Sequence, residues 1–347
     1  MPFDLSVIIP VRNEAPRIPG LIAMLARQEG IDHHLILVDG QSTDETVTTA
    51  QQHARQAGIP LIVEEAPPNR AIQIQRGIPF ATAPLTMILH ADSRFDDPLS
   101  LRKGIDLLRP GEGGVRGGHF RLRFEERDLL PPRWLVFQEA KARLPRHDCI
   151  HGDQGLIFPT SWLSRQPPLP QDRPMLAETI LANRMLDDGG MVLLASDITT
   201  SARRFLTEGI GGRQLVNALI LNAHRIGWDR FFREGLPLYR EQNESGRLDS
   251  TRIVSHAVSL LEREGEKEKK RILRESGRHL AQNAWQIPLL FHLMVSTPRI
   301  PSRFPLIALY DRLCGPLLKG GVGGMVGEWL LRLWITRQLE DGASPPP

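Results

Sequence analysis

The chain has 347 residues, 41% of them hydrophobic and 24% charged, which is the composition of a soluble globular protein with one large core or two modest ones. Its 43 basic residues nearly balance its 40 acidic ones, so the formal charge of +3 excludes a broadly basic surface. Because the chain has only two tyrosines and no basic run interleaved with aromatic residues, we expect no nucleic-acid partner.

The first hundred residues alternate between apolar runs and amphipathic segments. The apolar, β-branched runs predict buried strands, and the segments between them have the spacing and the stop signals of helices. Ser42, with Glu45 three residues later, resembles a capping box at the start of the second helix. We expect strands at 5–11, 34–40, 60–65 and 85–90, and helices at 16–29, 42–58 and 70–81. This order predicts an α/β fold with a mixed, mainly parallel sheet and helices on both faces.

The pattern changes after residue 110. Gly113, Gly114, Gly117 and Gly118 surround the segment VRGGHFRLRF, whose alternation predicts a half-exposed strand. HGDQGLIF at 151–158 reads as an apolar strand with a polar lead. A proline-rich loop at 166–174 precedes a predicted helix over 176–190, and MVLLASDITTSARR predicts the last strand of this domain.

Beyond about residue 209 the pattern is helical. Apolar positions recur at helical spacing within 253–283, and the charge run EREGEKEKKR predicts a solvated helix face. The segments 285–296, 304–318 and 324–335 are apolar but too short to cross a bilayer. Three interpretations of them remain open: packing on the core, self-association, or an interfacial membrane contact, of which we favour the first two. We therefore expect a domain at 1–230, a helical C-terminal region at 231–340 and a disordered tail at 341–347.

Location follows from the cysteines and the first residues. Cys149 and Cys314 are far apart and in no metal-ligand spacing, which favours a reducing compartment. The stretch MPFDLSVIIPVRNE lacks a basic segment followed by a long apolar one, so we interpret it as part of the fold rather than a signal peptide. We expect a cytoplasmic protein, with the C-terminal region as a candidate contact with the inner face of the membrane.

Polar clusters follow three of the predicted parallel strands. They are PVRNEA at 10–15, VDGQSTDET at 38–46 and HADSR at 90–94. Each by itself is explained by turn formation, since Asn, Asp, Ser and Gly are common turn residues. Because the carboxyl ends of parallel strands share one edge of a sheet, the three clusters together indicate a ligand site. Carboxylates, backbone donors and helix N-termini at one edge suit a nucleotide with its phosphates and a divalent cation.

In this order and spacing, SVIIPVRNEA, LILVDGQSTDET and ILHADSR resemble the family 2 glycosyltransferases, which have the GT-A fold. Four further segments resemble a bacterial branch of that family in which a histidine replaces the first aspartate of the metal motif. These segments are NRAIQIQRG, GGHFRLRF, HGDQGLIF and TSARRF. The resemblance covers roughly residues 5–230 and implies a GT-A-like domain followed by a helical extension.

The resemblance also implies roles for individual residues. The turn from Pro10 to Glu14 would line the nucleoside pocket, Asp39 would accept a hydrogen bond from the base, and Gly40 replaces a second aspartate. The expected nucleotide-binding residues are Pro10, Arg12, Asn13, Glu14, Asp39, Arg70, Gln73, Ala91 and Asp92. Asp92 would bind the metal or the ribose, with His90 as a second metal ligand or as a hydrogen-bonded strand-end histidine. A neutral imidazole can ligate Mn²⁺, whereas Mg²⁺ prefers oxygen.

The catalytic side is assigned in the same way. Asp153 and Gln154 of HGDQG would lie near the sugar, and Arg203 and Arg204 would supplement the charge on the diphosphate. The family takes its base from a Glu-Asp pair at a helix start. The matching position here holds Glu178-Thr179, with the threonine where the base is expected. Because threonine cannot serve as that base, the candidates are Glu178, reaching in from one residue earlier, and Asp153.

Three functions are consistent with these patterns. The leading one is an inverting glycosyltransferase that uses a UDP- or GDP-linked sugar and a divalent cation, Mn²⁺ or Mg²⁺. The second is a degenerate transferase kept as a nucleotide-sugar binding or scaffold protein, which Thr179 at the base position motivates. A sugar nucleotidyltransferase is less favoured, because PVRNEAP lacks that class's glycine-rich loop. The acceptor stays open among lipid, saccharide and small molecule, and the apolar C-terminus mildly favours a lipid-linked one.

Overall fold

The structure is a computed structural model that describes residues 3–108, 116–235, 248–295, 300–301, 303–319 and 321–343. The chain separates into two compact units. Unit 1 comprises Met1–Arg127 and Gln138–Ser201, and unit 2 comprises Asp128–Phe137 and Ala202–Pro347. Gly113 and Gly114 of the predicted glycine cluster lie outside the described residues. The same holds for 344–347 of the predicted tail, whose first three residues end the last helix.

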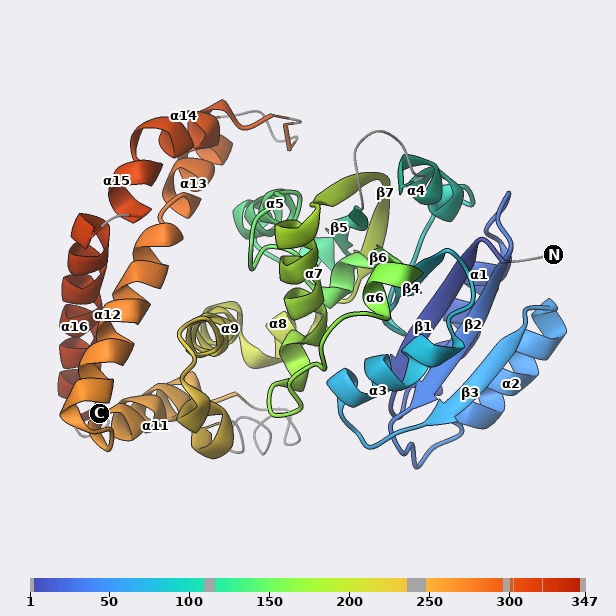
Figure 1. The fold of residues 1–347 in the computed structure, drawn as a ribbon, viewed down its shortest axis with the longest axis horizontal. Helices are drawn as coiled ribbons and strands as arrows, with labels where there is room; N and C mark the ends of the chain where they lie inside the picture. The colour runs from blue at the N-terminus through green and yellow to red at the C-terminus, as the bar shows by residue number, and fades with distance from the viewer. Residues whose placement is uncertain are drawn as a thin grey trace. The chain divides into compact units, whose positions relative to one another are not determined.

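Unit 1 is built on a seven-stranded sheet in the order β3-β2-β1-β4-β6-β5-β7 (Figure 1). The first four strands are parallel, with Val7 opposite Leu35 and Leu5 opposite Leu85. The predicted mixed, mainly parallel sheet is therefore confirmed. The strands are β1 Leu5–Val11, β2 His33–Asp39, β3 Leu61–Glu65, β4 Leu85–Ile88, β5 Gly117–Phe124, β6 Leu156–Pro159 and β7 Met191–Thr200.

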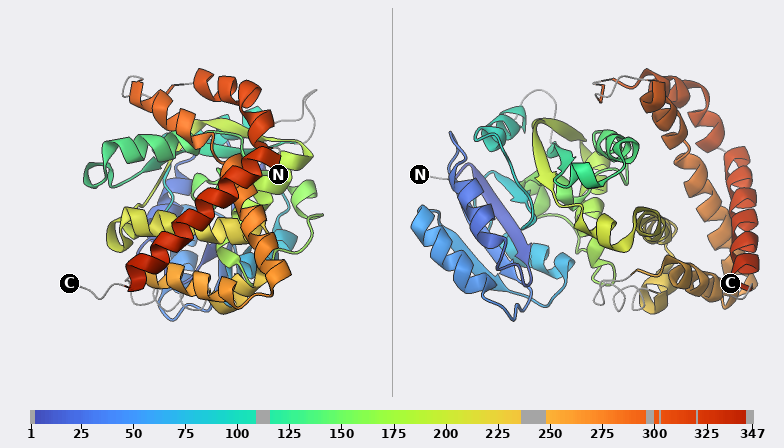
Figure 2. Two further views of the ribbon diagram at one scale, coloured as in Figure 1. Left: turned by 90° about the vertical axis from the view of Figure 1, so that its left-hand side faces the viewer. Right: turned by 180° about the vertical axis from the view of Figure 1, so that it is seen from behind.

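Helices cover both faces of this sheet, as its side-chain alternation requires. Val7 and Ile9 of β1 face a large core shared with α1, α2 and α4, whereas Ile8 faces the other side, where α3 and η1 pack. Figure 2 shows the same strands and helices from two further sides. The helical segments of unit 1 are α1 Ile18–Ala26, α2 Thr46–Ala57, α3 Arg70–Gly77, η1 Ile78–Phe80, α4 Ser100–Leu108, η3 Gly152–Gln154, α6 Thr160–Leu163, η4 Pro174–Leu176 and α7 Ala177–Asp188. Two segments lie across the unit boundaries, η2 Arg127–Leu129 and α5 Pro132–Lys141.

One antiparallel strand decides which segments meet at the carboxyl edge of the sheet. β6 runs antiparallel to β4, with Leu156 opposite Ile88. The chain therefore enters β6 at the edge where β4 leaves the sheet, and the short η3 helix lies there. β4 ends at Ile88, two residues earlier than expected, so His90 lies just beyond the strand. The polar lead of HGDQGLIF is brought to the HADSR cluster in this way.

Unit 2 is helical, as the sequence predicts beyond residue 209. Its helices after α5 are α8 Arg203–Glu208, α9 Ile210–Arg225, η5 Phe231–Gly235, α11 Ser250–Glu262, α12 Glu266–Gln282, α13 Gln286–Val295, α14 Pro305–Leu313, α15 Gly315–Lys319 and α16 Gly321–Ala343. Among the described residues, no helix combines the length and the hydropathy that crossing a bilayer requires.

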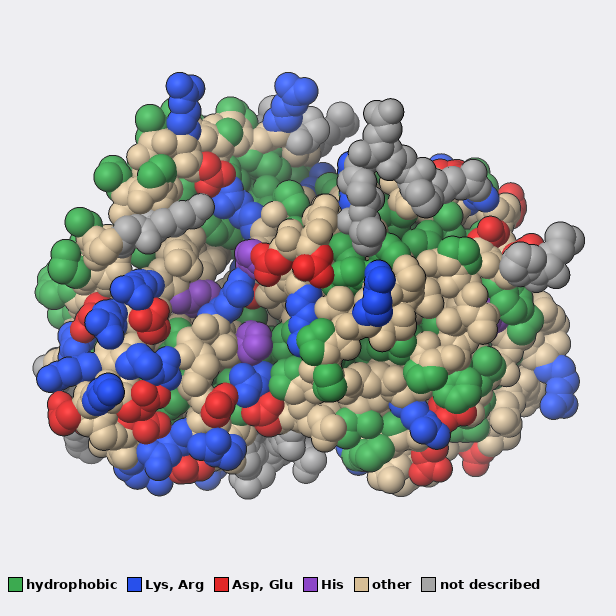
Figure 3. Space-filling view, viewed as in Figure 1, with side chains coloured by type: hydrophobic (Ala, Val, Ile, Leu, Met, Phe, Trp, Pro, Cys, Tyr) green, Lys and Arg blue, Asp and Glu red, His purple; other side chains and the backbone are tan. Residues whose placement is uncertain are grey.

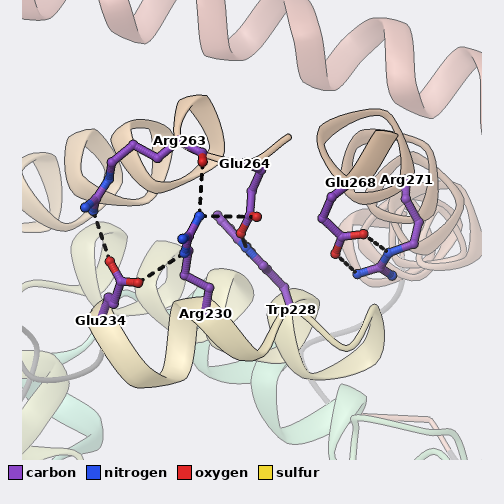
Figure 4. A network of polar contacts seen from close by, with 7 residues as sticks. All are labelled: Trp228, Arg230, Glu234, Arg263, Glu264, Glu268 and Arg271. Carbon is purple, nitrogen blue, oxygen red and sulfur yellow. Dashed lines mark hydrogen bonds and ion pairs between the residues drawn. The ribbon is translucent and has the colours of Figure 1, made fainter. Parts of the chain in front are cut away.

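The charged residues at 262–271, which were predicted to form a solvated helix face, also make ion pairs and hydrogen bonds within unit 2. It falls at the junction of α11 and α12, where Gly265 precedes α12. Figure 4 shows Glu264 accepting a hydrogen bond from the Trp228 indole at 3.0 Å and pairing with Arg230 at 3.3 Å. Arg230 also pairs with Glu234 at 3.0 Å. The run therefore ties the α11–α12 junction to the segment that follows α9.

Candidate active site

The loops after β1 and β2 are cross-linked by side-chain hydrogen bonds. The Asn13 N–H donates to Ser42 Oγ at 2.9 Å, and the Thr43 N–H donates to Asn13 Oδ1 at 2.8 Å. Asn13 has a φ of +54°, a left-handed conformation that asparagine tolerates better than most residues. Asp39, 7% exposed at the end of β2, accepts hydrogen bonds from the backbone N–H and the hydroxyl of Ser42. These bonds hold two of the three predicted clusters together at one edge.

The same contacts correct the predicted capping box. α2 begins at Thr46, and its N-cap residue Glu45 makes no side-chain capping bond. Ser42 is instead hydrogen-bonded to Asp39 and Asn13. The strand-end aspartate competes successfully for the serine hydroxyl, so the turn takes four more residues before the helix starts.

Gln73 is a structural tie at this edge. Its side-chain amide, 5% exposed, donates to the carbonyl oxygens of Val11 and Val38, each at 2.8 Å. A Cβ added at Gly40 would lie 2.9 Å from Gln73 Nε2 and 3.2 Å from the Val11 carbonyl oxygen. The glycine in place of a second aspartate thus leaves room for an amide that joins the ends of β1 and β2.

A cluster of three charged or polar side chains lies beyond β4. His90 Nε2 is 2.9 Å from Glu178 Oε1 and 2.6 Å from Arg70 Nη1, and Arg70 Nη1 is 3.3 Å from the same Glu178 oxygen. Asn69 caps α3 by accepting hydrogen bonds from two backbone N–H groups, which fixes Arg70 in the first turn of the helix. Because one nitrogen cannot both accept from the guanidinium and donate to the carboxylate, His90 serves one of them at a time.

The electrostatics of this cluster favour an ionised Glu178. Its side chain is only 3% exposed, and burial alone would raise the pKa of the carboxyl group. The nearby Arg70 charge and the His90 hydrogen bond outweigh burial and lower the pKa of Glu178 to about 2. The carboxylate is therefore a fixed negative charge that holds Arg70 and His90.

Gly152 allows this cluster to form. A Cβ at that position would lie 2.5 Å from His90 Nε2 and 2.8 Å from Glu178 Oε1. Any larger residue at Gly152 would have to push these two side chains away. The sequence offered HGDQG as a motif but no signal that its first glycine is a steric requirement.

Asp153, the next residue, has an environment of its own. Its Oδ1 atom is buried and has no hydrogen-bond partner among the described residues. Burial raises the pKa of Asp153 to about 6, with the neighbouring His90 lowering it and the Asp92 and Glu178 charges raising it. Asp92 is half-buried in the loop after β4, and the two carboxylates are close enough to interact electrostatically.

Thr179 and Gln154 point elsewhere. The Thr179 hydroxyl pairs with His151 Nδ1 at 2.8 Å, so Glu178, not Thr179, reaches the cluster with His90. Gln154 is fully buried, with its Oε1 atom 2.8 Å from His119 Nδ1 and its Nε2 donating to the Cys149 carbonyl at 3.0 Å. Both polar ends of Gln154 are therefore bonded within the protein, and its predicted contact with a sugar stays a prediction.

The remaining predicted residues are distributed around the edge and beyond it. Pro10 and Ala91 are buried, whereas Arg12 is exposed. The Glu14 backbone N–H donates to Thr46 Oγ1 at 2.8 Å, a further link between the two loops. Two of the predicted residues, Arg203 and Arg204, form the first turn of α8 in unit 2, and their role stays a prediction.

The donor set at the edge suits a divalent cation that is shared with a ligand. Among the described residues, no three His, Cys, Asp or Glu side chains gather into a group that could hold a metal ion. Mg²⁺ beside phosphates is usually held by one or two carboxylates together with phosphate oxygens. The Asp92 carboxylate fits that requirement. His90 fits it less well, because its Nε2 already contacts Arg70 and Glu178.

A mixed α/β sheet with polar strand ends gathered around carboxylates is the arrangement that the sequence predicts for a nucleotide-sugar transferase. Comparison with known families agrees, because residues 6–169 match the model of glycosyl transferase family 2. Residues 6–169 are therefore similar to the family 2 glycosyltransferases, and the predicted GT-A-like fold is confirmed. The bacterial branch within the family stays a prediction.

Individual relatives are more distant. The chain is 28% identical over 150 residues to an uncharacterized glycosyltransferase of Mycobacterium tuberculosis, a match that covers 42% of this chain and 63% of the relative. It is 38% identical over 88 residues to a PGL/p-HBAD biosynthesis glycosyltransferase of the same species, covering 25% of this chain and 34% of that relative. A mannosyltransferase from Pyrobaculum calidifontis, solved with GDP-Man and Mn²⁺, has a TM-score of 0.49 and 18% identity, covering 96% of this chain and 88% of the other.

Proposed function

We propose that the protein is an inverting glycosyltransferase that moves a sugar from a UDP- or GDP-linked donor to an acceptor hydroxyl. The observation that carries the proposal is the convergence at one sheet edge of three strand-end segments with the η3 turn and the start of α7. Asn13, Asp39 and Asp92 come from three parallel strand ends, and Asp153 enters from an antiparallel one. The family 2 match to residues 6–169 supports glycosyl transfer as the chemistry.

The donor would lie along the loops after β1 and β2. Asp39 is buried and already oriented by Ser42, so a carboxylate acceptor is held in place for a nucleobase N–H. The Pro10–Glu14 turn is fixed by Asn13 and would form the wall of the nucleoside pocket. Gln73 would act by holding this wall, since its amide is bonded to Val11 and Val38.

The diphosphate would lie near Asp92 and Arg70. A divalent cation held there would stabilise the charge that develops on the leaving diphosphate. Asp92 would hold the cation together with diphosphate oxygens, and His90 would join it only if Arg70 and Glu178 gave up its Nε2. Arg70, with a side chain 36% exposed, would add a second positive charge.

Of the two predicted catalytic carboxylates, Asp153 is the better candidate for the base. Glu178 is bound by a guanidinium and an imidazole, and a carboxylate held in that way is a weak proton acceptor. Asp153 has a buried oxygen without a hydrogen-bond partner among the described residues. Its pKa, raised by burial to about 6, is also nearer to neutral pH. Glu178 would then be a positioning residue for Arg70 and His90.

The test is donor hydrolysis and transfer, screened with Mn²⁺ and Mg²⁺ across UDP- and GDP-sugars. Asp92→Ala should abolish turnover and weaken nucleotide binding, whereas Asp96→Ala, a 74% exposed carboxylate in the same loop, should leave both unchanged. If the native protein showed no nucleotide binding and no turnover, the proposal would be refuted. Tight nucleotide binding without turnover across a broad acceptor panel would favour a nucleotide-sugar binding protein instead.

The assignment of the base has its own test. Asp153→Asn should lower kcat by roughly 100-fold or more, the usual contribution of a general base, with little change in donor KM. Glu178→Gln should raise the donor KM as well, because Arg70 and His90 lose their anchor. Equal kcat and KM for Asp153→Asn and the native enzyme would show that another group is the base.

A further inference from the structure

The exposed apolar side chains are concentrated in the last helices. Among the described residues, 14 of the 19 exposed large hydrophobic side chains lie between Ile287 and Leu333. On α13 they recur at 287, 290, 291, 294 and 295, and on α16 at 322, 325, 326, 329, 330 and 333. This is the spacing of an apolar stripe that normally faces a core. We call this set of exposed side chains on α13–α16 the apolar face. Figure 3 shows hydrophobic side chains at the left edge of the view, where α15 and the upper part of α16 lie.

The packing of α16 explains why its stripe points outward. α16 lies along α12 through glycines: a Cβ added at Gly327 would collide with the carbonyl of Gly277, and one at Gly277 would lie 2.8 Å from the Gly324 carbonyl oxygen. Met325 and Trp329 are meanwhile 65% and 62% exposed. Small residues between helices and large apolar residues outside is the arrangement that helices adopt against lipid, the reverse of a helix pair in water.

Charge around the apolar face points to an anionic partner. Between Ile287 and Leu333 the sequence has five Lys or Arg residues but only Asp311 and Glu328 as acidic residues. Arg303 and Arg312 are exposed, and Arg312 lies directly before the exposed Leu313 in α14. Basic residues that flank an apolar helix face are typical of helices that lie in the interface of an anionic bilayer.

We infer that the apolar face binds the surface of a membrane that contains anionic lipids, lying in its interface rather than crossing it. A second copy of the chain is the alternative occupant, and the experiment below distinguishes it from a membrane. The surface would bring the protein to the membrane whatever the chemistry of the unit 1 site, so this inference does not depend on the proposed function.

The experiment is flotation of the full-length protein with vesicles of phosphatidylcholine, with and without phosphatidylglycerol. The native protein should float with the anionic vesicles, and added salt should weaken this binding. Met325→Ser/Trp329→Ser should lower the affinity roughly tenfold or more, because the buried apolar area is lost. Arg303→Gln/Arg312→Gln should lower it on the order of tenfold on anionic vesicles and much less on neutral ones.

The matched control is Leu107→Ser/Leu129→Ser, which removes two exposed side chains, 50% and 69% exposed, that are not part of the apolar face. This variant should float like the native protein, and circular dichroism should show that all variants are folded. Absence of vesicle binding by the native protein would overturn the inference. A stable dimer that Met325→Ser/Trp329→Ser dissociates, without vesicle binding, would overturn it in favour of self-association.

Discussion

Replacing Arg70 with glutamine isolates the charge that holds the buried Glu178. The substitution keeps a polar side chain but removes the guanidinium that lies 3.3 Å from Glu178 Oε1 and 2.6 Å from His90 Nε2. The matched control is Arg76→Gln on the same helix, where the arginine pairs with Glu64 at 2.9 Å and is 58% exposed. Both variants lose one ion pair of α3, but only Arg70→Gln removes the guanidinium from a buried carboxylate, that of Glu178.

The magnitude follows from the pKa of Glu178. The pKa of the Glu178 carboxyl group falls from an ordinary 4.5 to about 2, although burial opposes this change. This shift corresponds to roughly 3 kcal/mol of net favourable interaction with the ionised form. His90 contributes part of this, and water screens Arg70, whose side chain is 36% exposed. We therefore expect Arg70→Gln to lower the free energy of unfolding by roughly 1–3 kcal/mol at pH 7. Arg76→Gln should cost less than about 1 kcal/mol, as exposed pairs do.

The direction of the pKa shift determines how the stability changes with pH. Because the folded-state pKa of Glu178 is lowered, its contribution to stability is present above pH 4.5 and is lost as the pH falls toward 2. The difference between the native protein and Arg70→Gln, measured by urea unfolding, should therefore shrink between pH 7 and pH 3. An Arg70→Gln effect no larger than that of Arg76→Gln, or one independent of pH, would refute the argument that Arg70 stabilises a buried carboxylate.

Two further predictions concern the core of the site. Gly152→Ala should destabilise the protein by roughly 1–3 kcal/mol and disturb His90, because the new Cβ needs space that this ring occupies. The control Gly20→Ala should be neutral or stabilising, because a Cβ there would have nothing within 4 Å. Equal thermal stability of the two variants would contradict the steric argument. Burial lowers the pKa of His119 to about 4 in the folded protein. As the pH falls, His119 is therefore protonated in the unfolded chain before it is protonated in the folded protein, and stability should decrease from pH 6.5 to pH 4. That slope should be smaller in His119→Gln than in the native protein. Equal slopes in urea titrations of the two proteins would show that His119 is not the source.

Much of the candidate site could be predicted from local sequence. Apolar β-branched runs favour strands, and the carboxyl ends of parallel strands share one edge of a sheet, so PVRNEA, VDGQSTDET and HADSR were expected to lie together. The predicted capping box was wrong because Ser42 is hydrogen-bonded to Asp39 and to the backbone N–H of Asn13, in the loop after the first strand, instead of capping α2. The role of Gln73 was also hidden, since its partners are backbone carbonyl oxygens of two other segments.

The catalytic side depended on long-range contacts. Sequence spacing left Glu178 and Thr179 as competing candidates, because successive helical residues differ by about 100° in direction and only packing decides which one faces a site. The structure turns Glu178 toward His90 and Thr179 toward His151. The meeting of Arg70 with Glu178, 108 residues apart, needs the antiparallel entry of β6 and the docking of α7, which no local pattern encodes.

The sequence by itself therefore determined the alternating α/β order, the polar strand ends and the helical periodicity of the C-terminal region, since each follows from short-range patterning. Only the tertiary structure decided which carboxylates share the edge and which way the last helices face. The stripe on α16 has the spacing of a core-facing helix, yet close glycine packing against α12 turns it outward. The partner that packs on one side of a helix decides where its other side points, and no local pattern in α16 specifies that partner.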